Sequence, residues 1–172
     1  MRNMIVLILM VINIVLVIIL ANTLTPHSCP APVELQERNL DDLLDAIEWV
    51  ESRGNASAIG DNGRAVGAYQ IHKIYVDDVN RILKGWKQQI GDQIKEAGGK
   101  GLGGWFVPYT YDDRRNRILS RDMTRVYLTY YSPSNDNLEQ MARIHNGGPN
   151  GWEKDSTKPY WLKVKARLNS PE

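Results

Sequence analysis

The chain has 172 residues, enough for one domain with short appendages. Its 21 basic and 20 acidic residues give a formal charge of +1, so no overall basic field is present that would hold nucleic acid or an anionic surface. Cys29 is the only cysteine, which excludes an intramolecular disulfide.

The first predicted element is an apolar segment near the N-terminus. Residues 4–21 are apolar except for Asn13, a run longer than a signal-peptide core and just long enough to span a bilayer. Arg2 precedes the run and no basic residue follows before Arg38, which places the N-terminus in the cytoplasm. We therefore predict a signal-anchor over residues 1–21, favoured over a cleaved signal peptide. In either case the rest of the chain is exported, as a membrane-anchored or a secreted domain.

A linker is predicted to follow over residues 22–38. Three prolines, Pro26, Pro30 and Pro32, favour an extended conformation. Cys29 lies in this segment and is interpreted as an incidental linker residue. The globular domain is then expected over residues 39–172.

The domain is predicted to begin with an amphipathic helix over residues 39–54, with Asn39 as N-cap and Gly54 at its end. Its apolar side chains form one stripe at helical spacing: Leu40, Leu43, Leu44, Ile47 and Val50. Glu51 falls near the middle of this stripe. Burial disfavours the charged form of a carboxyl group and raises its pKa, which is how proteins obtain a general acid near neutral pH. A helix-end Glu that faces solvent or pairs with an arginine is the alternative.

Residues 55–70 predict a short β-hairpin or an extended loop. They contain Gly60 and Gly67 and the turn signal Asp61-Asn62-Gly63. Aspartate is common in such turns because its side chain can hydrogen-bond to the nearby backbone, so a structural role is an alternative for Asp61.

The remaining elements are predicted to be mainly helical. Apolar spacing indicates helices over about residues 72–83, 120–131, 134–144 and 159–168. Residues 84–117, rich in glycine and aromatic residues, are predicted to form a long loop. Its acidic and basic run is expected to be solvated and self-neutralising: Asp112, Asp113, Arg114, Arg115 and Arg117. The fold class predicted is α+β, predominantly α, with a small β-hairpin.

Three short segments occur in a fixed order in this domain. They are Val50-Glu51-Ser52, then Gly67-Ala68-Tyr69-Gln70-Ile71, then residues 142–149, Ala-Arg-Ile-His-Asn-Gly-Gly-Pro. Together they resemble the lysozyme-like superfamily, above all the invertebrate-type (destabilase-like) lysozymes, with similarity also to soluble lytic transglycosylases. The resemblance covers about residues 40–165, and the last segment is the most specific.

The resemblance implies a lysozyme-like fold and a role for each matching residue. Glu51 matches the family's catalytic acid, and Asp61 matches the second carboxylate of invertebrate-type lysozymes. Residues implied to bind the sugar chain are Ser52, Tyr69, Gln70, His145, Asn146 and Gly147. The amides among them suit N-acetyl and hydroxyl groups, with local capping as the alternative. For His145 a structural role is favoured over a catalytic one.

The chain also departs from the family pattern. The invertebrate-type enzymes are cystine-rich, whereas this domain has no cysteine, so packing must replace the disulfides. The Phe of the family's Gly-Tyr-Phe-Gln is missing, and no transglycosylase Ala-Glu-Asn segment is evident. In the region 84–117, which aligns with nothing in the family, Trp105, Tyr109 and Tyr111 are candidates either to stack on sugars or to anchor the loop.

The implied function is a peptidoglycan muramidase. Breaking a glycosidic bond needs an acid for the leaving oxygen and stabilisation of an oxocarbenium-like centre. Glu51 is then the general acid for the β-1,4 bond between N-acetylmuramic acid and N-acetylglucosamine. If Asp61 is structural, the alternative is a lytic transglycosylase giving 1,6-anhydromuramyl products. A non-catalytic, membrane-tethered peptidoglycan-binding module and a wall-opening component of a larger apparatus are further alternatives. No cofactor is expected, and no Cys/His cluster predicts a metal site.

Overall fold

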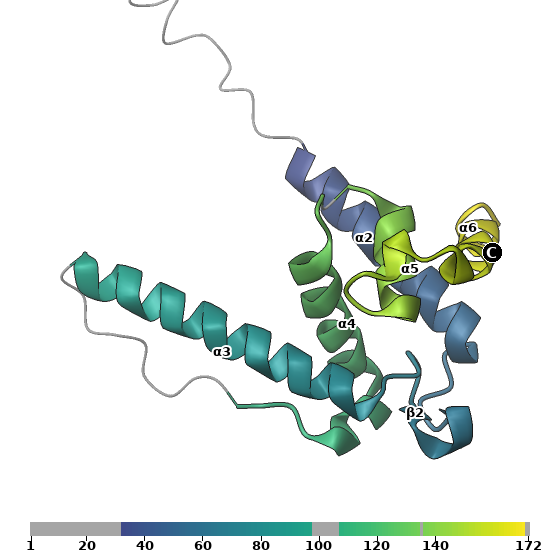
Figure 1. The fold of residues 1–172 in the computed structure, drawn as a ribbon, viewed down its shortest axis with the longest axis horizontal. Helices are drawn as coiled ribbons and strands as arrows, with labels where there is room; N and C mark the ends of the chain where they lie inside the picture. Colours follow the sequence, from purple (N-terminus) through teal and green to yellow (C-terminus); the bar gives the residue numbers. More distant parts are fainter. Residues whose placement is uncertain (1–31, 98–106, 135, 171–172) are drawn as a thin grey trace, which may run out of the picture. The chain divides into compact units, whose positions relative to one another are not determined.

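The computed structural model describes residues 32–97, 107–134 and 136–170 (Figure 1). Residues 35–172 form one compact unit, and the fold below is that of this unit. The predicted signal-anchor over 1–21 lies outside the described residues, as do Cys29 and most of the predicted linker. Among the helices that are described, none is long and apolar enough to cross a membrane.

Helix α2 spans Pro32–Ser52 and so begins before the predicted cap at Asn39, which lies inside the helix. The prediction of a linker through residue 38 is therefore wrong from residue 32 onward. Proline is tolerated in the first turn of a helix, and residues 34–38, Glu-Leu-Gln-Glu-Arg, are good helix formers. The helix ends close to the predicted position, before Gly54 with its φ of 78°.

The predicted β-hairpin is confirmed. Strands β1 (Ile59–Gly60) and β2 (Ala65–Val66) pair antiparallel, with Ile59 opposite Val66. The short 3₁₀ turn η1 (Asp61–Gly63) joins them, and all three of its residues have positive φ. This left-handed backbone is the conformation that Asp, Asn and Gly tolerate best.

Arg114 fastens the hairpin to the turn η2 (Tyr111–Arg115). Its buried guanidinium donates to the carbonyl oxygens of Arg64 and Ile71, at 3.2 and 3.1 Å. Gly67 packs so closely here that a Cβ atom would lie 1.8 Å from the Arg114 carbonyl oxygen. The prediction of a solvated charge run is thus wrong for Arg114, because its guanidinium is buried and donates to backbone carbonyl oxygens.

The other helices are α3 (Lys73–Glu96), α4 (Arg117–Tyr131), α5 (Leu138–Gly147) and α6 (Lys158–Leu168). Short 3₁₀ turns η3 (Gly151–Glu153) and η4 (Asp155–Thr157) connect the last two. The predicted helices are confirmed, but α3 continues to Glu96, so residues 84–96 are not loop. Lysine, glutamine and glutamate are strong helix formers and outweigh the two glycines of this stretch.

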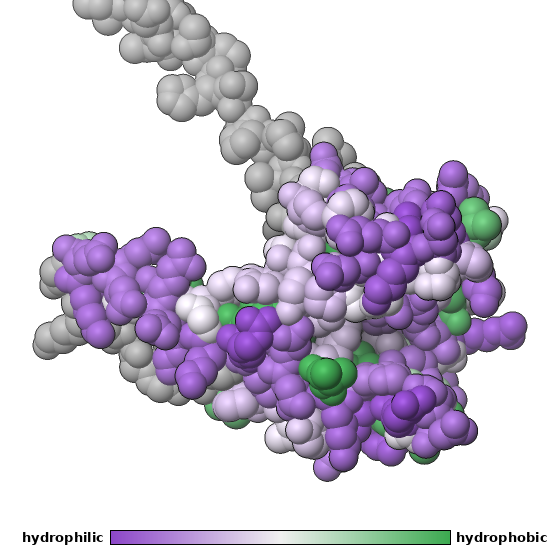
Figure 2. All heavy atoms as spheres, in the orientation of Figure 1, coloured by the Kyte–Doolittle hydropathy of each residue, from purple (hydrophilic) through white to green (hydrophobic). Residues whose placement is uncertain are grey.

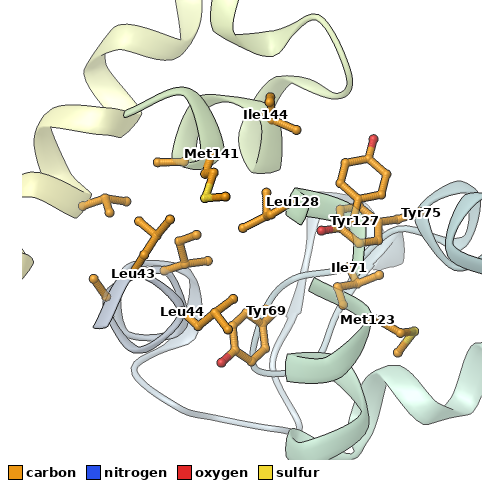
Figure 3. Close-up of a cluster of buried hydrophobic side chains, with 14 of the residues drawn as sticks. Leu43, Leu44, Tyr69, Ile71, Tyr75, Met123, Tyr127, Leu128, Met141 and Ile144 are labelled. Carbon is orange, nitrogen blue, oxygen red and sulfur yellow. The ribbon is translucent and has the colours of Figure 1, made fainter. Parts of the chain in front are cut away.

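The core is formed by one face of each helix and by the segment after the hairpin. Helix α4 packs between α3 and α5, and α5 packs in turn against α6 (Figure 1). Figure 3 shows the buried side chains, among them Leu43, Leu44, Tyr69, Ile71, Met123, Leu128 and Met141. On the face in Figure 2, hydrophobic residues form only small separate spots among the described atoms. The fold is therefore mainly helical with a small antiparallel sheet, as predicted.

Candidate active site

A cavity of about 770 Å³ lies where the end of α2, the hairpin, the start of α3 and the end of α5 meet. Its lining includes Glu51 and Asp61 from the first two elements and His145 and Asn146 from α5. Residues more than 80 positions apart in the sequence thus share one site. The structure brings together both predicted carboxylates and the most specific of the three family-like segments.

Glu51 is the carboxyl group most separated from water in this cavity. Its side chain is 19% exposed. Desolvation raises the pKa of Glu51 to about 7, while the Tyr160 hydroxyl and the charge of Lys163 act in the opposite direction. Glu51 therefore carries a proton on a large fraction of molecules at neutral pH, as a general acid requires.

His145 lies beside Glu51 and is neutral at the same pH. Burial lowers the pKa of His145 to about 4, partly offset by its hydrogen bond to the Tyr69 carbonyl. That bond, 3.2 Å long, requires the proton on Nε2, which leaves Nδ1 to accept from the Tyr75 hydroxyl at 3.5 Å. Nε2 is also 3.6 Å from Glu51 Oε1. Because His145 is uncharged near pH 7, this is a polar contact and no ion pair.

Tyr160 is a site residue that the sequence analysis missed. Its buried hydroxyl makes no hydrogen bond of standard geometry within the described part of the chain. It nevertheless lies close enough to Glu51 to favour the carboxylate. The only signal in the sequence was a tyrosine in the first turn of the predicted last helix, and nothing local related it to Glu51.

Asp61 lines the same cavity in a contrasting setting. Its side chain is 39% exposed and sits on the hairpin turn with φ 47°. Arg64 donates to Oδ1 at 2.6 Å, and His72 Nε2 lies 3.2 Å from Oδ2. His72, a residue to which the sequence assigned no role, thus contacts the second carboxylate.

The residues expected to bind sugar divide into two groups. Gln70 and Asn146 line the cavity, and the Gln70 side-chain amide donates to the Gly67 carbonyl at 2.9 Å. Ser52 lies outside the lining, and its hydroxyl donates to the Ala68 carbonyl at 2.8 Å. Gly147 also lies outside it, and its carbonyl accepts from Lys154 at 2.6 Å.

The expected contact of the Tyr69 side chain with sugar is corrected by the structure. Tyr69 is completely buried, and its hydroxyl contacts Arg121 at 3.1 Å and Glu48 at 3.5 Å. Gln70, with φ 48°, turns its side chain toward the cavity instead. Tyr69 therefore contributes its carbonyl to the site, and this carbonyl orients His145.

Of the aromatic residues proposed to stack on sugars, Tyr109 and Tyr111 are described by the structure, and neither lines the cavity. Asn80 holds the backbone of Tyr109 through two hydrogen bonds of 2.8 and 2.9 Å, and the Tyr111 hydroxyl donates to Asp77. These contacts anchor the segment to α3. Trp105 lies outside the described residues. Within the described ranges no group of three potential ligands is placed to hold a metal ion.

Comparison with known proteins finds no matching family model, but two oyster lysozymes match parts of the chain. Lysozyme 1 of Crassostrea virginica is 36% identical over 55 residues, which are 30% of this chain and 30% of that protein. A lysozyme of Magallana gigas is 49% identical over 43 residues, which are 23% of this chain and 31% of that protein. The chain thus spans less than a third of the length of these curated relatives. The matches confirm the resemblance to lysozymes and support a lysozyme-like family.

Proposed function

We propose that this protein is a peptidoglycan-cleaving glycosidase of the muramidase type, with Glu51 as its general acid. The observation that carries the proposal is the largely buried Glu51 carboxyl in a cavity, with a pKa of about 7. Such a group can donate a proton at neutral pH, whereas an ordinary glutamate is already ionised. The similarity to two lysozymes supports the same class of reaction.

In this reaction Glu51 donates its proton to the oxygen of the β-1,4 glycosidic bond, and the bond between that oxygen and the anomeric carbon breaks. The positive charge that develops on the sugar ring is stabilised by the negative charge of Asp61 in the same cavity. Water then attacks the anomeric carbon and returns a proton to Glu51. Gln70 and Asn146 offer amide groups to the sugar substituents.

Two contacts of Asp61 favour a second outcome of the same chemistry. Both oxygens of Asp61 already have partners, Arg64 on Oδ1 and His72 on Oδ2. A carboxylate held in this way also suits a structural role, in which it fixes the turn that carries it. In that case the muramic acid 6-hydroxyl replaces water as the nucleophile, which is the lytic transglycosylase reaction.

The sequence supports a proposal for the cellular setting. Peptidoglycan lies outside the cytoplasmic membrane, and the apolar run over residues 4–21 supports export of the domain. We therefore propose that the protein acts on the wall either tethered by this segment or after secretion.

The test is digestion of purified peptidoglycan with the full chain, followed by mass analysis of the released muropeptides. Products with reducing ends indicate hydrolysis, and anhydro ends indicate transglycosylation. Glu51→Gln should lower product formation by about 10²- to 10⁴-fold, the usual contribution of a general acid. Asp42→Asn, which removes an exposed carboxylate from the same helix, is the matched control. Absence of products from the wild-type protein would overturn the proposal and favour a binding module.

A further inference from the structure

The proposed reaction uses Asp61 but leaves its partner His72 without a role. We propose that His72 is a positioning residue that holds the Asp61 carboxylate in the cavity, an inference that rests on the proposed function. His72 and Asp61 both line the cavity, and their side chains meet at 3.2 Å, Nε2 to Oδ2.

The two partners of Asp61 differ in what they can fix. Arg64 belongs to the same hairpin, three residues further on, so its ion pair moves with the turn. His72 lies outside the hairpin, after strand β2 and directly before α3. Only a contact of this second kind can orient the Asp61 carboxylate relative to the rest of the site.

The backbone of His72 is well anchored, in contrast to the exposed turn that carries Asp61. His72 is the N-cap of α3, and its carbonyl accepts from the Tyr75 and Val76 amides at 3.1 and 3.4 Å. The preceding Ile71 is buried and bonded in both directions to Val66. The N-terminus of a long helix also carries a partial positive charge, which favours a carboxylate nearby.

The pair is too exposed to be explained by stability. The side chains of His72 and Asp61 are 42% and 39% exposed. Even ion pairs in such exposed positions contribute little to folding, commonly less than about 1 kcal/mol, and a neutral polar contact contributes no more. This contact adds little to the free energy of unfolding, but it involves a candidate catalytic carboxylate. Its main effect is therefore expected on the rate of the reaction.

The experiment is a double-mutant cycle on the full chain, with kcat and KM measured on peptidoglycan fragments. His72→Ala should lower kcat by about 10- to 100-fold, the scale expected when a reacting group is misplaced. KM and the melting temperature should stay nearly unchanged. In the Asp61→Asn background, the same substitution should lower kcat by no more than about twofold, because coupled residues are non-additive.

Two further variants separate positioning from a general disturbance. His72→Gln keeps an N–H donor near Asp61 and should retain more of the rate than His72→Ala. Lys73→Ala removes a charge from the next residue, which does not line the cavity, and should leave kcat unchanged. Equal losses from His72→Ala in both backgrounds, or no loss at all, overturn the positioning role. If the wild-type protein itself releases no products, the proposed function fails instead.

Discussion

The two sides of the cavity contain the same pair of residue types in opposite surroundings. On one side Glu51 and His145 are held away from water, with side chains 19% and 4% exposed. On the other side Asp61 and His72 are open to solvent, at 39% and 42%. Burial suppresses charge on both members of the first pair, whereas the second carboxylate keeps an arginine partner.

This difference shows how one cavity can supply both an acid and a fixed negative charge. A carboxyl group that keeps its proton can protonate a leaving oxygen, and a carboxylate that has lost its proton can stabilise a cation. The chemistry is thus assigned by the distance of each carboxyl group from water and by its neighbours. The unperturbed pKa values of glutamate and aspartate differ too little to assign one residue type as the acid and the other as the fixed charge.

After the loss expected from Glu51→Gln, the largest expected effect concerns the solvent-exposed side. Asp61→Asn removes the negative charge and should lower kcat by about 100-fold, the scale of losing one electrostatic stabiliser. The measurement is the rate of muropeptide release. A rate close to that of the wild type would remove Asp61 from the chemistry and leave the buried side to act alone, as in transglycosylation.

The buried side predicts the pH dependence. Because Glu51 must carry a proton, kcat/KM should fall about tenfold per pH unit above about pH 7. His145, with a pKa of about 4, should not contribute to this limb. Rates measured between pH 5 and 9 check this, and a flat profile up to pH 9 would contradict the assignment of Glu51.

Burial of Glu51 should also cost stability. Between pH 4.5 and 7 the folded protein keeps a proton on Glu51 that the unfolded chain has lost, so the free energy of unfolding falls as the pH rises. The loss is at most about 3 kcal/mol. Glu51→Gln has no titrating group at this position and therefore does not lose this free energy. It should be more stable than the wild type at pH 8, but not at pH 4.5. Urea unfolding at both pH values measures the difference, and an equal difference at both would disprove the cause.

The smallest expected effect comes from Tyr160. Its hydroxyl favours the Glu51 carboxylate, so Tyr160→Phe should raise the pKa of Glu51 and move the upper pH limit of activity upward by about one unit or less. The pH profile of kcat/KM is the measurement. A downward shift would show that the hydroxyl instead favours the protonated acid.

Much of the fold could be predicted because it depends on local pattern. The apolar stripe of α2 indicated that Glu51 faces the core side, and the turn at Asp61-Asn62-Gly63 indicated the hairpin. The start of α2 and the length of α3 were missed, since proline and glycine were given more weight than the strong helix formers around them.

The site was predicted less completely, for a different physical reason. Tyr69 and Gln70 are neighbours in one family-like segment, but the chain buries the first against Arg121 and turns the second into the cavity. The partners His72 and Tyr160 were not identified, because each contacts a carboxyl group on another element. Residue spacing along the chain carries no information about such contacts.

The order of the amino acids was sufficient to specify the helices, the hairpin and an acidic residue on the apolar face of a helix, because hydrophobic periodicity and turn chemistry act over a few residues. The protonation of that acid is a property of the folded molecule. Its pKa depends on how much water the surrounding elements exclude and on which dipoles and charges they bring near, and those neighbours come from parts of the chain up to about 110 residues away.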